Sequence, residues 1–354
     1  MHTTQEWNPP PGWRRICTVD AHAAGEPLRI VTEGWPPVPG ATMGERRRYA
    51  REHQDGLRRA LIWEPRGHAD MYGCILTEPA TDDGDAGVLF LHNEGFSTMC
   101  GHGVIGLVTV GLECGLLRPR PEEDSGRATL RLDTPAGRVI ARALFAAGEP
   151  ETPRVERVSF QNVPSFVLEP DLPIDVPGIG RIRCDIAFGG AYYAYVDAEE
   201  LGLTLAPRDL PRIVDVGMRI KRAVMEAYEI VHPEDDADLA FLYGTILVGP
   251  ATRPGVHSRN VCVFANGEVD RSPTGTGVSG RAALHHRRGD LPAGERVTIE
   301  SIIGSTFDVR VVAETRVGRL RAIVPEVTGS AHITGRHEFL IDPADPLQEG
   351  FLLR

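Results

Sequence analysis

Two segments of the chain are built alike, and they constrain its fold more than any other feature of the sequence. Residues 99–103 read MCGHG, and residues 270–277 read DRSPTGTG. Each segment places a small nucleophilic side chain, Cys100 or Thr274, before a glycine pair and a stretch compatible with a helix. We therefore expect two helix N-termini that together form one active site.

The order of elements around these segments also repeats. Each half of the chain has a strand pair with a tight turn, a charged helical stretch, a strand-like run, and then the glycine segment with its helix. The ranges are 15–31, 44–59, 88–92 and 103–117 in the first half, and 181–196, 210–228, 260–265 and 277–288 in the second. This repetition predicts two homologous α/β (α+β) lobes, each with strands wrapped around one helix.

A proline-rich stretch marks the expected boundary between the lobes. Residues 163–178 contain four prolines and few apolar runs, which is typical of a connection between domains. The predicted domains are residues 1–165, which carry Cys100, and residues 166–337, which carry Thr274. The tail, residues 338–354, is a candidate to return to the first lobe.

The charge of the chain limits its partners. The net charge is -11, whereas nucleic acid and anionic membranes both require a basic surface, so neither is expected as the main partner. The arginine runs 46–48 and 58–59 are flanked by acids and are interpreted as solvated helix faces. Residues 1–13 are polar, and no stretch approaches the roughly 20 apolar residues that span a bilayer. A cytoplasmic location is therefore expected.

The six cysteines are scattered, and none forms a CxxC pair. A metal site or a redox motif is therefore not expected. All of them except Cys100 are interpreted as small buried apolar residues.

Cys100 is the candidate base. A helix N-terminus lowers the pKa of a thiol from its usual value of about 8.5. Gly101 and Gly103 let a ligand approach the backbone, whose N–H groups could hold a carboxylate. Neutralising a carboxylate acidifies its α-carbon, so a thiolate could remove the α-proton. Such a mechanism requires no cofactor: no metal, no pyridoxal phosphate and no nicotinamide.

Other interpretations of the first glycine segment are weaker. Cys100 could be a buried structural cysteine. A protease-like pair of Cys100 and His102 is disfavoured because residues i and i+2 do not face each other on a helix. The glycines of residues 101–106 match GxGxxG, but no acidic residue ends a second strand about 20 residues later, as a dinucleotide site requires.

The chain resembles the proline racemase family over most of its length. The segments that carry the resemblance are residues 20–27, 64–71, 99–103, 133–137, 188–191, 270–277, 300–304 and 333–335. The resemblance implies a diaminopimelate-epimerase-like fold of two pseudo-symmetric lobes, with an imino acid substrate bound in the cleft between them.

The resemblance also implies roles for individual residues. In the racemases of the family, a cysteine from each lobe flanks the α-carbon, and these positions are Cys100 and Thr274 here. His102 and Asp270 match the residues that contact the ring nitrogen of the substrate. The backbone amides that bind the carboxylate match Gly101, His102, Gly275 and Thr276.

Thr274 is where this chain departs from the racemase pattern. Racemisation needs a base on one face of the α-carbon and an acid on the other, and a threonine hydroxyl is too weakly acidic to exchange these roles. Family members with the Cys/Thr pair look like trans-3-hydroxy-L-proline dehydratases. A dehydratase that forms Δ1-pyrroline-2-carboxylate through the Δ2 enamine is therefore the leading hypothesis. A homodimer is considered as its assembly, but these residues do not determine the oligomeric state. A 4-hydroxyproline 2-epimerase or proline racemase, and a catalytically silent ligand-binding protein, remain as alternatives.

Overall fold

The computed structural model describes residues 7–119, 126–147 and 153–353. The first six residues of the polar N-terminal segment lie outside these ranges. The strands in the first part of the chain are β1 (Arg14–Ala23), β2 (Glu26–Glu33), β3 (Tyr72–Thr77), β4 (Ala86–His92), β5 (Gly95–Ser97), β6 (Arg127–Thr134), β7 (Gly137–Phe145), β8 (Val155–Gln161) and β9 (Ser165–Val176). Those in the second part are β10 (Gly180–Phe188), β11 (Tyr192–Asp197), β12 (Leu242–Gly249), β13 (Ser258–Phe264), β14 (Glu268–Val269), β15 (Arg296–Glu300), β16 (Thr306–Val317), β17 (Leu320–Gly329) and β18 (Ala331–Ile341). The helices are α1 (Met43–His53), α2 (Asp55–Ile62), α3 (Gly101–Glu113), α4 (Leu210–Ala227) and α5 (Gly275–Arg288), with a 3-10 turn, η1 (Pro207–Asp209).

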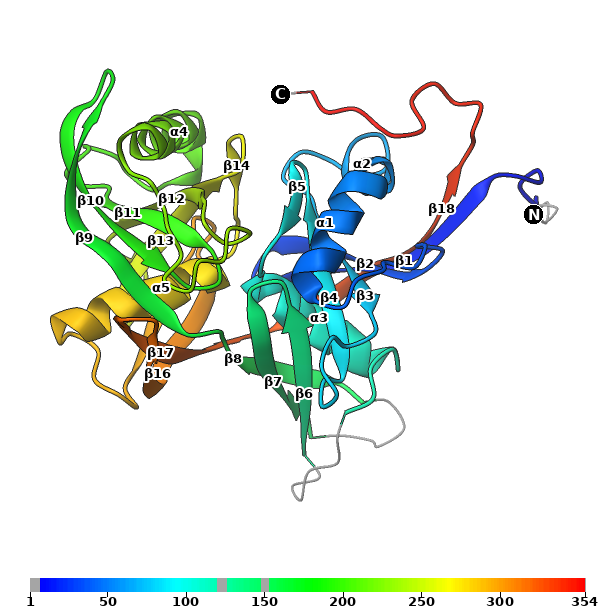
Figure 1. Cartoon of the computed structure of the whole chain (residues 1–354), viewed down its shortest axis with the longest axis horizontal. Coiled ribbons are helices and arrows are strands. Elements are labelled where there is room, and N and C mark those ends of the chain that lie inside the picture. Colours follow the sequence, from blue (N-terminus) through cyan, green and yellow to red (C-terminus); the bar gives the residue numbers. More distant parts are fainter. Residues whose placement is uncertain (1–6, 120–125, 148–152, 354) are drawn as a thin grey trace.

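The two halves of the molecule lie side by side and repeat one strand topology (Figure 1). In the first half, β2 pairs parallel with β3, β3 antiparallel with β4, and β4 parallel with β6. In the second half, β11, β12, β13 and β15 follow the same sequence of parallel and antiparallel pairings. The mixed α/β fold of two pseudo-symmetric lobes predicted from the sequence is confirmed.

Each half is wrapped around one buried helix. Every residue of α3 from Gly101 to Leu112 is buried, and so is every residue of α5 from Gly275 to Leu284. Both helices contribute to one apolar core cluster, which also contains Phe90, Phe160 and Phe307. A helix that is enclosed on all sides cannot rely on a polar face, which explains the glycine, alanine and valine content of α3 and α5. These helices begin two residues earlier than predicted, and α3 ends at Glu113 instead of Leu117.

The proline-rich segment, at which the boundary between the lobes is expected, forms a strand. Residues 165–176 form β9, which pairs with β10 and β17. Burial alternates along this strand: Pro173 is exposed, Ile174 is buried, Asp175 is exposed and Val176 is buried. This period-two alternation is the strand signal that the prolines obscured.

The last strands of the chain connect the halves. β17 pairs with β16 in the second half and also with β8. β18 then pairs antiparallel along the whole of β1. Beyond it, Phe351 forms an isolated bridge with Glu64. The residues at which the chain divides, 165/166 and 337/338, stay a prediction.

The surface helices differ from the prediction in two respects. The expected helix over residues 44–59 is two helices, α1 and α2, broken at Gln54. Two of the arginines assigned to a solvated face are buried. The Arg47 Nε–H donates to the Phe96 carbonyl (2.7 Å), and Arg58 Nη1–H donates to the His92 carbonyl (2.7 Å). These carbonyl partners satisfy the guanidinium groups away from water.

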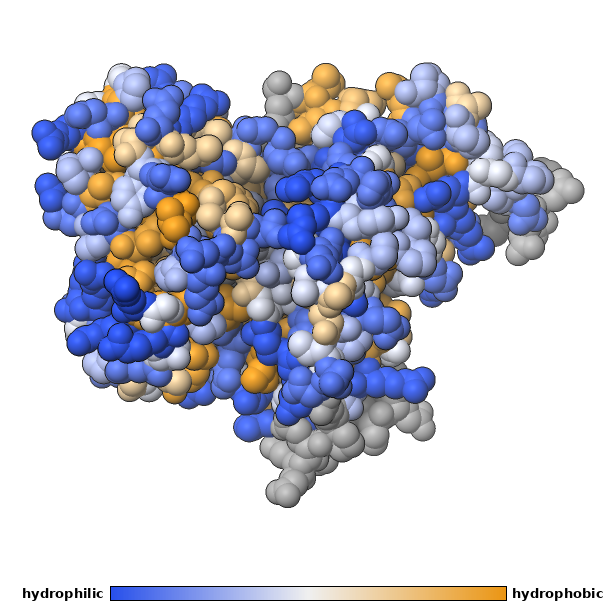
Figure 2. Space-filling model, viewed as in Figure 1, coloured by the Kyte–Doolittle hydropathy of each residue, from blue (hydrophilic) through white to orange (hydrophobic). Residues whose placement is uncertain are grey.

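The outer surface is mostly hydrophilic on the face shown in Figure 2, with apolar patches over the half that contains α4 and α5. Leu210 and Met225 of α4 are exposed, although the inner face of that helix is buried as its helical periodicity predicted. No helix in the described ranges is both long enough and apolar enough to cross a membrane.

Candidate active site

The N-termini of α3 and α5 meet at the junction between the two halves. A Cβ atom on Gly101 would lie 2.5 Å from the Gly275 Cα atom, and a Cβ on Gly275 would lie 2.7 Å from the Gly101 Cα. Only glycine allows this approach, because a real Cβ never comes so close to backbone. The two helix ends therefore point their free N–H groups into one small space.

All of the site residues predicted from the sequence line that space. Cys100, Gly101 and His102 come from the start of α3. Thr274, Gly275 and Thr276 come from the start of α5, and Asp270 comes from the loop between β14 and α5. The cavity that they enclose has a volume of about 20 Å³, which is room for about one water molecule. The cavity is therefore closed and, as it stands, too small for a ligand of the size of an amino acid.

Cys100 caps α3. Its backbone is extended, and its Sγ accepts a hydrogen bond from the Gly103 N–H (3.2 Å). Burial nevertheless raises the pKa of the Cys100 thiol well above its usual range, and the nearby carboxylates of Asp270 and Glu26 raise it further, while the Gly103 N–H opposes them. The expected lowering of this pKa is thus wrong for the closed site, because desolvation outweighs the helix end.

His102 lies against the Cys100 thiol. Its Nδ1 atom is 3.2 Å from Sγ, which corrects the expectation that residues i and i+2 could not face each other. Helical spacing does not apply here because Cys100 is the cap and has no helical backbone. Burial lowers the pKa of His102 to about 4, although Asp270 acts in the opposite direction, so the ring is neutral at pH 7.

Asp270 and Arg271 bring charge to the junction. Asp270 is buried, and its Oδ1 accepts the Ser272 N–H (2.7 Å). The backbone N–H of Arg271 donates to Glu26 Oε2 (2.7 Å), and its guanidinium donates to the Asp70 carbonyl (2.6 Å). These contacts join the two halves beside the cavity. The arrangement offers helix N-termini to an anion and the Asp270 carboxylate to a cation.

Thr274 caps α5 differently from the way Cys100 caps α3. Its φ is +67°, a value that a β-branched residue rarely adopts, and its side chain makes no capping hydrogen bond. The Thr274 hydroxyl is buried and has no hydrogen-bond partner of regular geometry in the described part of the chain. Its neighbour Thr276 shares a hydrogen bond with the Tyr193 hydroxyl (2.7 Å).

The sequence reasoning missed several residues that line the cavity. Tyr72 donates a hydrogen bond to Ser97 Oγ (2.6 Å), and its hydroxyl is 3.1 Å from that of Tyr243. Cys262 of β13 is buried as expected, and it also lines the cavity. Cys114 is exposed and departs from the same expectation. The signal for the tyrosines was the repeat itself, since Tyr72 and Tyr243 stand at the starts of the corresponding strands β3 and β12.

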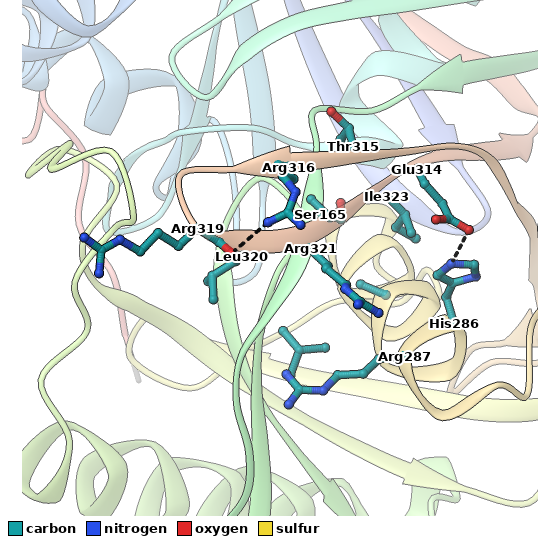
Figure 3. Close-up of a pocket in the computed structure, with 13 residues that line it drawn as sticks. Ser165, His286, Arg287, Glu314, Thr315, Arg316, Arg319, Leu320, Arg321 and Ile323 are labelled. Carbon is teal, nitrogen blue, oxygen red and sulfur yellow. Dashed lines mark hydrogen bonds and ion pairs between the residues drawn. The ribbon is translucent and has the colours of Figure 1, made fainter.

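A roomier pocket, of about 700 Å³, lies elsewhere, between α5, β16 and β17 (Figure 3). It is lined by arginines, including Arg287 and Arg321, and contains the pair of His286 and Glu314 (3.2 Å). None of the predicted site residues lines it. Size alone therefore does not identify the site, and the chemistry is concentrated in the small cavity between the helix ends.

The repeated topology and the facing helix ends define a class, the two-lobed α/β proteins of the diaminopimelate-epimerase-like fold. A solved PhzF-family phenazine biosynthesis protein from Bacillus anthracis shares this fold, with a TM-score of 0.55 at 14% identity, covering 92% of this chain and 99% of that one. Within that class, the chain belongs to the proline racemase family, whose family model matches residues 18–352.

Individual relatives are similar over almost the whole chain. The trans-3-hydroxy-L-proline dehydratase of Colwellia psychrerythraea is 44% identical, covering 99% of this chain and 97% of its own. The human trans-3-hydroxy-L-proline dehydratase is 45% identical, with 97% and 96% covered. A hydroxyproline epimerase structure from Agrobacterium vitis, with bound trans-4-hydroxy-L-proline, has a TM-score of 0.88 at 32% identity and covers 96% of each chain.

Proposed function

We propose that this protein is a trans-3-hydroxy-L-proline dehydratase, a hydro-lyase, with Cys100 as its base. The observation that carries the proposal is the pairing of one thiol and one hydroxyl, Cys100 and Thr274, at the two facing helix ends. The dehydratases that are 44% and 45% identical to the chain support the same reaction.

Binding uses both helix ends. The substrate carboxylate accepts hydrogen bonds from the N–H groups of Gly101, His102, Gly275 and Thr276, which removes the charge that otherwise disfavours loss of the α-proton. The ring ammonium group lies between His102 and Asp270. This cation also lowers the pKa of Cys100 from the value that burial raises, because an opposite charge nearby favours the thiolate.

The reaction then takes place on one face of the ring. In trans-3-hydroxy-L-proline the 3-hydroxyl and the α-hydrogen lie on the same face. The Cys100 thiolate takes the α-proton, the electrons of the C–H bond form the C2–C3 double bond, and the C3–O bond breaks. The new Cys100 thiol faces the departing hydroxide and gives it the proton, so that water leaves and the thiolate is restored. The Δ2 enamine that remains tautomerises to Δ1-pyrroline-2-carboxylate.

One assay tests the reaction against its alternatives. The protein is incubated separately with trans-3-hydroxy-L-proline, trans-4-hydroxy-L-proline and L-proline, and products are followed by NMR and chiral chromatography. Dehydration of the first substrate, without inversion of the other two, is the expected result. Inversion of trans-4-hydroxy-L-proline or L-proline at a rate rivalling dehydration would replace the proposal with an epimerase or racemase. Binding without turnover would indicate a silent ligand-binding protein.

The proposal also includes an assembly and a location for the enzyme. We propose that it is a homodimer and that it is located in the cytoplasm. Light scattering of the purified protein and fractionation of the source cells test them. A monomer at all concentrations, or recovery with the membrane fraction, would contradict them.

A further inference from the structure

Four arginines line the pocket of about 700 Å³ between α5 and the hairpin of β16 and β17. Arg287 belongs to α5, Arg316 to β16 and Arg321 to β17, and Arg319 lies in the turn between the two strands. Figure 3 shows Arg321 and Arg287 reaching from strand and helix into the space between them. This arginine pocket is positively charged in a chain whose net charge is -11.

The strand register places two of these arginines directly opposite each other. Arg316 is the antiparallel partner of Arg321, so both side chains project from the same face of the hairpin. Like charges at directly opposite positions destabilise a strand pair. Arg316 Nη1–H donates to the carbonyl of Arg319 (3.4 Å), which is an uncharged partner. The last turn of a helix favours cations, which accounts for Arg287 of α5 but not for the pair on the hairpin.

Acidic side chains do not balance the pocket. Glu314 is the one acidic residue among the lining residues that the structure describes, and its Oε1 atom is 3.2 Å from His286 Nε2. In the described part of the chain, none of the four arginines forms an ion pair. Four guanidinium groups therefore share one carboxylate, which already has a partner.

Arginines of the same elements that lie outside the pocket do have acidic partners. In α5, Arg288 Nη2 is 2.7 Å from Asp185 Oδ2, and in β16, Arg310 Nη2 is 2.7 Å from Glu326 Oε1. Neither arginine lines the pocket. The excess of positive charge is therefore confined to the pocket and is not a general property of α5 and β16.

The size and lining of the pocket indicate what can bind there. Its volume lies within the range of about 300–1,000 Å³ that is typical of small-molecule sites. Guanidinium groups bind phosphate through paired N–H donors, and a ligand with two phosphate groups could contact helix and hairpin together. Leu320 and Ile323 also line the pocket and offer apolar surface to an organic group.

We propose that the arginine pocket is a binding site for a small polyphosphate, either free or carried by an organic group. The ligand accepts hydrogen bonds from Arg287 on one side and from Arg316 and Arg321 on the other. It thereby connects the C-terminal end of α5 to the hairpin. The pocket shares no lining residue with the cavity that contains Cys100, so this site is separate from the candidate active site.

Calorimetry with three probes tests the ligand chemistry. ADP and pyrophosphate carry the phosphate groups, and adenosine carries the organic group alone. We expect ADP and pyrophosphate to bind, with affinities that fall as salt is added, and adenosine not to bind. Tighter binding of ADP would assign the ligand to an organic phosphate, and equal affinities would assign it to the polyphosphate itself. Binding of adenosine as tight as that of ADP, or no binding of either phosphate, would overturn the proposal.

Variants of the hairpin locate the binding. Arg316→Gln/Arg321→Gln is expected to weaken binding of ADP and pyrophosphate at least about tenfold, because charge-assisted hydrogen bonds are lost. The matched control is Arg181→Gln/Arg222→Gln, which removes two positive charges at exposed positions outside the pocket and is expected to change the affinity less than about twofold. Equal affinities for the two double variants would overturn the proposal.

Two further measurements separate a ligand site from a structural role. Glu314→Gln removes the carboxylate from the pocket and is expected to strengthen ADP binding, which is opposite to the effect of the arginine variants. Without ligand, Arg316→Gln/Arg321→Gln is expected to unfold at a temperature no lower than wild type, because like charges are removed. Weaker ADP binding by Glu314→Gln, or a lower unfolding temperature of the arginine variant, would overturn the proposal.

Discussion

Cys100 is held between opposing effects. The Gly103 N–H favours its thiolate, and burial beside Asp270 and Glu26 favours the neutral thiol. In the closed cavity burial dominates. Under the proposed function, the ammonium group of the substrate would favour the thiolate, so that binding and formation of the reactive thiolate would be coupled.

Replacement of the thiol tests this assignment directly. Cys100→Ser is expected to slow dehydration at least about a hundredfold, the scale for loss of a general base, because a serine hydroxyl does not ionise near pH 7. Initial rates with trans-3-hydroxy-L-proline measure the effect. Cys17→Ser, outside the cavity, serves as the control. Turnover close to that of wild type would rule out Cys100 as the base.

The charge of Asp270 has its own test. Asp270→Asn keeps an oxygen that can accept the Ser272 N–H but removes the negative charge offered to the ring nitrogen. We expect a higher KM and a lower kcat together, since both binding and orientation weaken. Asp342→Asn is the matched control, because Asp342 Oδ1 accepts the Ala344 N–H (2.8 Å) in the same kind of turn outside the cavity. Unchanged kinetics for Asp270→Asn would contradict the clamp.

The residues of the candidate site were predicted from the sequence more accurately than their chemical properties. The two glycine segments predicted that the residues around Cys100 and those around Thr274 lie together, and in the structure they line one cavity. The raised pKa of Cys100 depends on burial by distant strands, which local sequence does not reveal. The same holds for Cys262, because its place in the cavity wall depends on how β13 lies beside the start of α5.

At the scale of elements, the contact of α3 with α5 sets the geometry of the site. The two helix ends approach so closely that neither Gly101 nor Gly275 tolerates a Cβ. In the proposed reaction, a carboxylate between them would receive N–H groups from both helices. Small changes in this contact are therefore expected to alter both binding and the distance from Cys100 to the α-carbon.

Gly101→Ala is the variant that changes this contact. A Cβ would force α3 and α5 apart, and we expect about a hundredfold loss of kcat/KM, the scale for a misplacement of about 1 Å. Thermal unfolding would show whether the fold survives. Gly44→Ala in the first turn of α1 is the control, because its Cβ would meet its nearest atom, Asp238 Oδ2, at an ordinary 3.5 Å. Full activity of Gly101→Ala would show that the contact is not needed.

Elements with a strong periodic pattern were predicted well. The α4 helix spans Leu210–Ala227 against a predicted 210–228, because its apolar residues recur at helical spacing. The break between α1 and α2 was missed, since nothing local at Gln54 forbids a helix. The buried arginines of these helices were missed because their partners, such as the Phe96 and His92 carbonyls, are distant in sequence.

For the whole molecule, buried histidines connect stability to pH. Burial lowers the pKa of His102 and of His285 to about 4 each. The unfolded chain, with histidine pKa values near 6.5, binds more protons than the folded chain between about pH 4 and 6.5. These groups therefore destabilise the fold as the pH falls through that window, and add no further loss below it.

His285→Gln isolates one of these contributions. We expect the free energy of unfolding to fall less between pH 7 and pH 4.5 than it does for wild type, by at most about 1.4 kcal/mol per pH unit for one histidine. Denaturant unfolding at a series of pH values measures it, with the exposed His53→Gln as the control. An identical pH dependence for wild type and His285→Gln would refute the assignment.

The repeated architecture was visible in the sequence because both halves use the same order of local patterns. The strands that join the halves were not visible. β9 was hidden by its prolines, and the pairing of β18 with β1 connects residues at opposite ends of the chain. Such a long-range pairing leaves no local signal.

That pairing determines the order in which the protein can be completed on the ribosome. β1 (Arg14–Ala23) is made first, yet one of its two neighbours, β18 (Ala331–Ile341), emerges among the last residues. At roughly 5–20 residues per second, this delay of about 300 residues lasts on the order of tens of seconds. For that time the nascent chain presents an unpaired strand edge, which is a template for association with other chains. The half that begins folding first is therefore the half that finishes last.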